Sequence, residues 1–200
     1  MIVSTIILAG GKNLRMGRSK ASEIIGGKSL IEHVIERLRP LTRQILIVTS
    51  QQRPDLTVAG VETLVDLYPD RGPLAGIYTG LRYSQPSHSI VVACDMPFLN
   101  AGLLRHMVKL SRNFDAVVPR LEEGKVEPLH AVYSKSCLSV MEGMMKHNQL
   151  GVHSFLEAVN VRYVEREECQ RLDPELLSFF NINYQSDLDR AIMLAATGKH

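Results

Sequence analysis

The chain has 200 residues, of which 45% are hydrophobic and 22% are charged, enough apolar material for the core of one ordinary globular domain. Its 23 basic and 21 acidic residues leave a formal net charge of +2, which argues against nucleic acid or a membrane surface as the main partner. The three cysteines are far apart and odd in number, so we expect reduced thiols in a soluble, cytoplasmic protein. No stretch approaches the roughly 18 consecutive apolar residues that would predict a transmembrane helix.

Short runs rich in Val and Ile alternate with helical spacing along the first 119 residues. The runs at 2–9, 44–49, 62–65, 89–94 and 116–119 predict buried strands. The clearest helix is predicted over 30–39, where an apolar stripe follows a possible cap at Ser29 and ends before Pro40. Further helices are predicted to begin at Pro73 and to span 101–110. This alternation indicates a parallel α/β sheet.

After residue 119 the pattern changes. We predict a hairpin turn at 121–126 and a strand at 129–133 that returns to the sheet, which makes the sheet mixed. A Met-rich helix over 134–147, a short segment at 154–159, strands at 161–165 and 179–182, and a closing helix over 186–197 follow. The fold class is therefore α/β, a three-layer αβα arrangement of Rossmann-like type with a predominantly parallel, mixed central sheet, and 1–200 is expected to be a single domain.

A glycine-rich basic loop follows the first predicted strand. It contains Gly10, Gly11 and Gly17 together with the cations Lys12, Arg15, Arg18 and Lys20. Glycines let backbone N–H groups approach a phosphate, and the cations offset its charge. The spacing matches neither the Walker pattern nor the dinucleotide fingerprint. Without further context, an exposed turn with solvated arginines explains the loop equally well.

Two aspartates stand at predicted strand ends. Asp95 follows the strand at 89–94 and Asp66 follows the strand at 62–65, whereas Asp70 in the next loop is expected to be solvated. The carboxyl ends of strands form the ligand crevice in open α/β sheets, and Mg²⁺ prefers carboxylate, phosphate and water oxygens. Asp95 is thus the candidate Mg²⁺ ligand. A helix N-cap or an Asx-turn residue before the helix at 101–110 is the alternative for Asp95, and a turn residue is the alternative for Asp66.

The order of residues carries a resemblance. The basic loop resembles the signature loop of the nucleotidyltransferase superfamily with a GT-A-like α/β fold, in particular that of the molybdenum cofactor guanylyltransferases. The likeness lies in Leu-Ala-Gly-Gly at 8–11, followed by Arg-Met-Gly at 15–17 and then Lys20. The segments at 72–76, 94–98, 127–133 and 179–183 extend the likeness from residue 5 to about 190. Two departures are visible. Ser19 replaces an acidic residue that is common in the family, and the segment 149–154 has no arginine where the family has a basic stretch.

The resemblance implies roles for several residues. The nucleotide would be bound by Leu8, Ala9, Gly10 and Gly11, and Leu8, Ala9 and Gly10 would contact the guanine and sugar end of GTP. The GTP phosphates would lie against Arg15 and Lys20. Asp66 would contact the nucleotide, and Asp95 would hold Mg²⁺. The nucleotide-binding half would be about 1–100 and the acceptor-binding half about 101–200.

Three residues beyond 119 have open interpretations. Asn181 and Asn183 would share one face of the predicted strand at 179–182, where they could bind the acceptor or cap the next helix. His130 is expected to be a hydrogen-bonded core or rim histidine and not a proton-transfer group.

The implied reaction transfers GMP from GTP to the phosphate of molybdopterin or of the molybdenum cofactor and releases pyrophosphate. The resemblance also implies molybdoenzyme-maturation proteins as partners, with no nucleic acid or membrane partner. The alternatives are a CTP-dependent cytidylyltransferase acting on the same cofactor, a sugar- or polyol-phosphate nucleotidyltransferase, and a non-catalytic nucleotide-binding regulatory module. A dinucleotide-binding oxidoreductase is disfavoured because no acidic ribose ligand follows the second strand.

Overall fold

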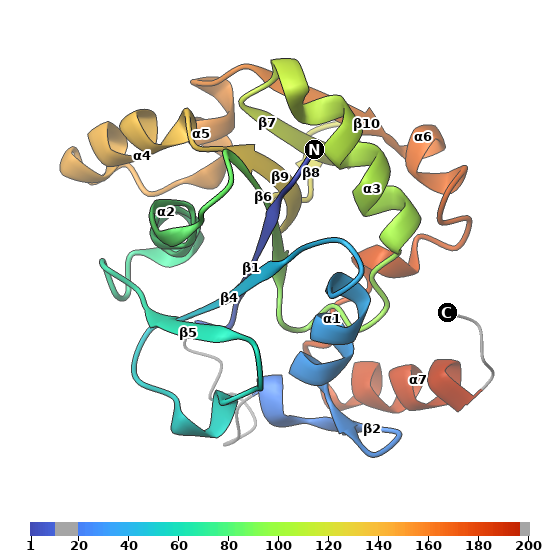
Figure 1. Cartoon of the computed structure of the whole chain (residues 1–200). Helices are drawn as coiled ribbons and strands as arrows, with labels where there is room; N and C mark the ends of the chain where they lie inside the picture. The colour runs from blue at the N-terminus through green and yellow to red at the C-terminus, as the bar shows by residue number, and fades with distance from the viewer. Residues whose placement is uncertain (11–19, 197–200) are drawn as a thin grey trace.

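The computed structural model of the chain describes residues 1–10 and 20–196, with the backbone alone for Lys20. An eight-stranded sheet forms its centre, in the order β10-β7-β9-β6-β1-β4-β5, with β8 paired to β7 (Figure 1). Its strands are β1 (Ser4–Leu8), β4 (Gln44–Thr49), β5 (Glu62–Val65), β6 (His88–Ala93), β7 (Ala116–Glu122), β8 (Lys125–Val126), β9 (His130–Ser134) and β10 (Val161–Glu165). A separate hairpin pairs β2 (Ile24–Ile25) with β3 (Lys28–Ser29).

The strand directions confirm a mixed, mostly parallel sheet. Strand β1 lies between β4 and β6 and is parallel to both; β5 is parallel to β4, and β10 is parallel to β7. Strand β9 is antiparallel to both β6 and β7. Two reversals restore the original direction, so β7 runs the same way as β1. The carboxyl ends of β1, β4, β6 and β7 therefore meet at one edge of the sheet.

Helices cover both faces of this sheet. They are α1 (Leu30–Leu38), α2 (Gly72–Tyr83), α3 (Ala101–Leu110), α4 (Cys137–Lys146), α5 (Val152–Glu157), α6 (Arg166–Gln170) and α7 (Gln185–Ala196), with short 3-10 turns η1 (Lys20–Ser22), η2 (Pro54–Leu56), η3 (Ser111–Asn113) and η4 (Leu177–Phe179). Apolar residues of α1 and α3 pack on one face, and those of α2, α4 and α5 pack on the other (Figure 1). This arrangement confirms the predicted three layers. In the part of the chain that the structure describes, no helix has the length and apolar character needed to span a membrane.

Helix α1 forms as the sequence predicts. The apolar stripe Leu30, Ile31, Val34, Ile35 and Leu38 is buried along its whole length. Ser29 stands at the N-cap in an extended conformation and forms a capping box with the Glu32 side chain, whose Oε2 accepts the Ser29 N–H at 2.7 Å. The predicted strands at 44–49, 62–65 and 161–165 and the predicted helix at 101–110 also match the observed elements.

Helix α2 approaches the sheet closely because it carries a glycine where it crosses β1. A Cβ atom added at Gly80 would lie 2.4 Å from Ile6 Cγ2, a separation that real Cβ atoms do not show. The glycine therefore lets the helix backbone rest almost directly on the central strand. This close packing places the first turn of α2 at the carboxyl ends of β1 and β4.

The strand predicted at 179–182 is wrong. The structure has the 3-10 turn η4 (Leu177–Phe179) there, followed by residues outside any strand. Ile182 is buried against α7 and the β2–β3 hairpin, and the Phe179 ring lies 4.7 Å from the ring of His130. A short apolar run can be buried in a loop as readily as in a strand, and its periodicity does not distinguish the two. Asn181 and Asn183 therefore do not share the face of a strand.

Candidate functional site

A cavity of about 320 Å³ opens where the carboxyl ends of the central strands meet the first turn of α2. This volume lies within the range of small-molecule sites. The lining residues come from six separate segments: Leu8, Gly10, Val48, Thr49, Ser50, Asp66, Asp70, Gly72, Pro73, Gly76, Ala93, Cys94, Asp95 and Leu129. Four candidate residues, Leu8, Gly10, Asp66 and Asp95, are thus brought together.

Backbone hydrogen bonds hold the end of β1 between its two neighbours. The Ala9 N–H donates to Val48 O at 2.9 Å, and the Cys94 N–H donates to Leu8 O at 3.1 Å. Leu8 lines the cavity and Gly10 is exposed at its edge. The candidates Gly11 and Arg15 lie outside the described residues, and so does the side chain of Lys20.

Asp66 follows β5 and extends its carboxylate into the cavity. Its N–H donates to Thr49 O at 2.8 Å, which attaches the turn to the end of β4. Its Oδ1 accepts hydrogen bonds from Thr79 Oγ1 at 2.7 Å and from the Tyr68 N–H at 3.0 Å. Burial raises the pKa of Asp66 above its ordinary value, while these two hydrogen bonds act in the opposite direction.

Gly76 lines the cavity beside Leu8 and Asp66. A Cβ atom added there would lie 3.2 Å from Leu8 Cδ2 and 3.8 Å from Asp66 Oδ2. Even the smallest side chain would therefore press on Leu8 and fill space beside the Asp66 carboxylate. The glycine in the 72–76 segment thus keeps open the part of the cavity that these two residues share.

Asp95 follows β6 at the same edge of the sheet. Its backbone oxygen accepts the Ile182 N–H at 3.1 Å, so the C-terminal segment lies beside it. The alternative of a helix cap is wrong, because the N-cap of α3 is Asn100, whose Oδ1 accepts the Leu103 N–H at 3.0 Å. Among the described residues, no three His, Cys, Asp or Glu side chains gather closely enough to hold a metal ion by themselves.

Asn181 and Asn183 flank the residue that hydrogen-bonds to Asp95. The Asn181 Nδ2 donates to Phe179 O at 3.3 Å, within the same turn. The backbone N–H of Asn183 donates to Asp187 Oδ2 at 2.9 Å, and the N–H of Tyr184 donates to the same oxygen at 2.8 Å. The start of α7 is thus stabilised by the Asp187 carboxylate.

His130 is a core residue, as expected, but the expected hydrogen bond is wrong. The side chain is fully buried, and within the described residues neither ring nitrogen has a hydrogen-bond partner. Loss of solvation lowers its pKa from 6.5 to about 4. The ring is therefore a neutral packing element against Phe179 at neutral pH.

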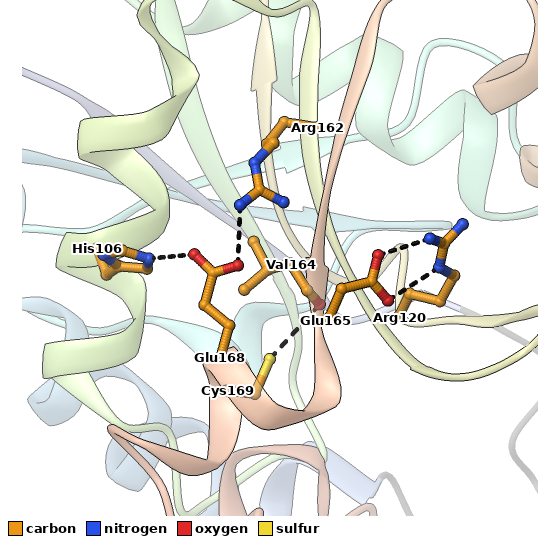
Figure 2. Close-up of polar contacts among 7 residues, drawn as sticks. All are labelled: His106, Arg120, Arg162, Val164, Glu165, Glu168 and Cys169. Atoms are coloured by element: carbon orange, nitrogen blue, oxygen red, sulfur yellow. Dashed lines mark hydrogen bonds and ion pairs between the residues drawn. The ribbon is translucent and has the colours of Figure 1, made fainter.

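Hydrogen bonds and ion pairs connect the elements at the opposite edge of the sheet, around β7 and β10. Figure 2 shows the Glu168 side chain of α6 between His106 of α3 and Arg162 of β10. His106 Nε2 lies 2.7 Å from Glu168 Oε1, and Arg162 Nη2 donates to Glu168 Oε2 at 2.9 Å. Arg120 of β7 donates from Nε to Glu165 Oε2 at 3.1 Å. Burial acts to raise the pKa of Glu168, but the hydrogen bonds from His106 and Arg162 outweigh it and lower that pKa below its ordinary value. These hydrogen bonds and ion pairs connect α3, β7, β10 and α6.

Several cavity residues were not predicted. Thr49 ends β4 and Ser50 follows it. Both could have been found by the rule that strand carboxyl ends line the crevice, which selected Asp66 and Asp95. Asp70, expected to be solvated, is indeed exposed but also lies at the rim of the cavity. Leu129 precedes β9, and its backbone oxygen accepts the Ala93 N–H at 3.1 Å. The strand predicted at 129–133 was expected to return to the sheet, but the sequence does not indicate which strand it joins.

Comparison with known proteins adds to this geometry. Residues 5–165 match the model of the MobA-like NTP transferase domain. The chain belongs to the MobA-like NTP transferase family. A curated relative from Pelotomaculum thermopropionicum, named probable molybdenum cofactor guanylyltransferase, is 34% identical over 97% of this chain and 94% of its own length. A second relative, the molybdenum cofactor guanylyltransferase of Desulfosudis oleivorans, is 32% identical over 98% of both chains.

Solved structures agree with this family assignment. The crystal structure of molybdopterin-guanine dinucleotide biosynthesis protein A from Archaeoglobus fulgidus aligns with a TM-score of 0.83 and 31% identity, covering 98% of this chain and all of the other. The 2-C-methyl-D-erythritol 4-phosphate cytidylyltransferase of Thermus thermophilus aligns with a TM-score of 0.72 at 20% identity over 98% of this chain and 100% of its own. At that identity the likeness establishes the fold alone. The chain is a nucleotidyltransferase by family, and the predicted fold class and enzyme class are confirmed.

Proposed function

We propose that this chain transfers GMP from GTP to the terminal phosphate of molybdopterin, or of its molybdenum-loaded form, and releases pyrophosphate. The names of the relatives at 34% and 32% identity support this choice of substrates. The observation that carries the proposal is the cavity in which Leu8, Gly10, Asp66 and Asp95 meet at one edge of the sheet. The proposal treats 1–200 as one domain, with nucleotide binding in about 1–100 and acceptor binding in about 101–200.

The reaction needs positioning and charge neutralisation more than proton transfer. A phosphate monoester is largely ionised near neutral pH, so an acceptor oxygen can attack the α-phosphorus of GTP without a general base. The bond between the α-phosphorus and the bridging oxygen breaks, and its electron pair leaves with pyrophosphate. In this proposal Leu8, Ala9, Gly10 and Gly11 bind the nucleotide, and Asp66 accepts a hydrogen bond from it.

The charged groups have separate roles in the proposal. Lys20 and Arg15 neutralise the triphosphate and the departing pyrophosphate. The carboxylate of Asp95 at the cavity is an oxygen donor of the type that suits Mg²⁺ together with phosphate and water oxygens, so Asp95 would hold the ion. When bound, Mg²⁺ offsets phosphate charge and makes the α-phosphorus more electrophilic. Asn181 and Asn183 are proposed to bind the acceptor, because Ile182 between them hydrogen-bonds to the Asp95 backbone.

Cell location and protein partners are also proposals. We infer a cytoplasmic location, which the buried thiols of Cys137 and Cys169 and the need for GTP support. Association with molybdoenzyme-maturation proteins stays a prediction of the family resemblance.

The test is pyrophosphate release by the purified chain with Mg²⁺ and molybdopterin, comparing GTP, CTP, ATP and UTP. We expect release with GTP and the pterin together, and at least a hundredfold less with Asp95→Asn. Asp189→Asn, an exposed aspartate on α7, is the matched control and should keep wild-type turnover. A preference for CTP would indicate the cytidylyltransferase activity, and release with a sugar or polyol phosphate would indicate that acceptor class. Nucleotide binding without pyrophosphate release for any acceptor would indicate a regulatory module.

A further inference from the structure

The two carboxylate oxygens of Asp66 have different surroundings, and the difference bears on how the proposed nucleotide site works. Oδ1 is held by Thr79 Oγ1 at 2.7 Å and by the Tyr68 N–H at 3.0 Å. Oδ2 lies on the side of Gly76, where an added Cβ atom would be 3.8 Å away, and both residues line the cavity. Within the described residues, no donor hydrogen-bonds to Oδ2. Oδ2 is therefore the oxygen that is available to a ligand.

Thr79 is placed to fix this orientation. Its side chain is fully buried in α2, one turn beyond Gly76. Its hydroxyl accepts the Leu67 N–H at 3.1 Å while it donates to Asp66 Oδ1. The proton and a lone pair of the hydroxyl are thus both used, so the group cannot rotate without losing a hydrogen bond. A β-branched side chain in a helix also has few rotamers.

The helix that carries Thr79 is itself rigidly placed. Gly80 brings the α2 backbone directly against Ile6 of β1, as described above. The turn after β5 is attached to β4 through the hydrogen bond from Asp66 N–H to Thr49 O at 2.8 Å. Thr79 therefore connects two elements that are each fixed to the sheet, and the Asp66 carboxylate lies at the junction.

We propose that Thr79 is a positioning residue for nucleotide binding: its hydroxyl holds Oδ1 of Asp66 and so directs Oδ2 into the cavity, where it accepts an O–H or N–H donor of the bound nucleotide. The inference rests on the nucleotide site of the proposed function, and it assigns Thr79 no contact with the substrate. Burial raises the pKa of Asp66, and the Thr79 hydrogen bond acts against that rise. Without Thr79 the carboxylate would be freer to rotate and would take up a proton at a higher pH.

The test compares three variants of the full chain by calorimetric titration with GTP and Mg²⁺ between pH 5 and pH 8. Thr79→Val keeps the shape and removes the hydroxyl, and we expect about tenfold weaker GTP binding at pH 7, the effect of one hydrogen bond to a charged group. Thr79→Ser restores the hydroxyl and should bind within about threefold of the wild type. Thr5→Val is the matched control, because Thr5 is also fully buried and its Oγ1 has no partner among the described residues. It should bind GTP as the wild type does.

Three further readouts separate positioning from a merely structural role. In an Asp66→Asn background, Thr79→Val should change GTP binding by less than about threefold, because the two residues act through one contact. The pH below which GTP binding weakens should rise in Thr79→Val relative to the wild type. In turnover, the KM for GTP should rise while kcat changes little.

Two outcomes of the GTP titrations of Thr79→Val would overturn the inference that Thr79 positions Asp66. Thr79 would not act through Asp66 if Thr79→Val bound GTP with the affinity of the wild type. The same conclusion would follow if Thr79→Val reduced the affinity for GTP equally in the wild-type and the Asp66→Asn backgrounds. Failure of the wild type to bind any nucleoside triphosphate would overturn both this inference and the proposed function. If the wild type binds GTP but does not transfer GMP to molybdopterin, the proposed function fails, while the Thr79 comparison is still decided by the binding data.

Discussion

The buried His130 should make the protein less stable in mild acid. Within the described residues its ring nitrogens have no hydrogen-bond partner, and burial lowers its pKa from 6.5 to about 4. In the unfolded chain the ring takes up a proton near pH 6.5, whereas in the folded protein it stays neutral until about pH 4. The unfolded state therefore binds more protons between these values, and the free energy of unfolding falls as the pH falls through this window.

The size of this effect follows from the two pKa values. A tenfold difference in proton affinity corresponds to about 1.4 kcal/mol. The free energy of unfolding should therefore fall by about 3 kcal/mol in all by the time the pH reaches about 4. Between pH 7 and pH 5 the expected loss from this residue is about 2 kcal/mol. Typical domains have unfolding free energies of about 5–15 kcal/mol, so a loss of this size is readily measured.

The assay is urea unfolding at pH 7 and pH 5 of the wild type and of His130→Leu. The apolar variant lacks the titrating ring, so its stability should depend less steeply on pH, by about 2 kcal/mol over this interval. Val132→Ala, which shortens a buried side chain on the same face of β9, is the control. It should be less stable by a similar amount at both pH values. The prediction would be refuted if the free energy of unfolding fell by the same amount between pH 7 and pH 5 in the wild type and in His130→Leu.

Three further predictions concern stability and thiol reactivity. Thr5→Val should raise the free energy of unfolding by about 1 kcal/mol, because it removes a buried hydroxyl that has no partner among the described residues; urea unfolding checks this, and a loss would contradict it. Gly80→Ala should cost about 1–3 kcal/mol, because its Cβ would meet β1 at 2.4 Å. In contrast, Gly143→Ala in α4, with nothing within 4 Å of the added atom, should stabilise the protein by up to about 1 kcal/mol, and thermal melts of the two variants should shift in opposite directions. Burial raises the pKa of Cys137 and of Cys169 to about 12, so both should resist alkylation at pH 8 until urea unfolds the chain; rapid labelling of the native protein would contradict this.

Much of the fold could be predicted because its signals are local. The helix α1 needs only its apolar stripe and the capping residues Ser29 and Glu32, which lie close together in the sequence. The strands β4, β5 and β10 have the predicted bounds because Val- and Ile-rich runs stand between clear breaks. The strand-end rule also selected Asp66 and Asp95, and both line the cavity.

The failures share a physical cause. The run at 179–182 has the apolar character of a strand, but the described structure buries Ile182 against α7 and the β2–β3 hairpin without a ladder. The missing partners of His130 could not be read from the sequence either, because a strand position does not specify which side chains will face it. In both cases the outcome depends on residues far away in the chain.

Three features could be read from the order of amino acids, because each depends on neighbours within a few positions: the alternation of strands and helices, the cap of α1 at Ser29, and the acidic residues at strand ends. The tertiary structure alone places β9 antiparallel between β6 and β7, so that Leu129 reaches the cavity. It also decided that the Thr79 hydroxyl meets the Asp66 carboxylate at 2.7 Å. These features arise from the packing of α2 and the strands on one another, and packing is set by the shapes of side chains that are distant in sequence.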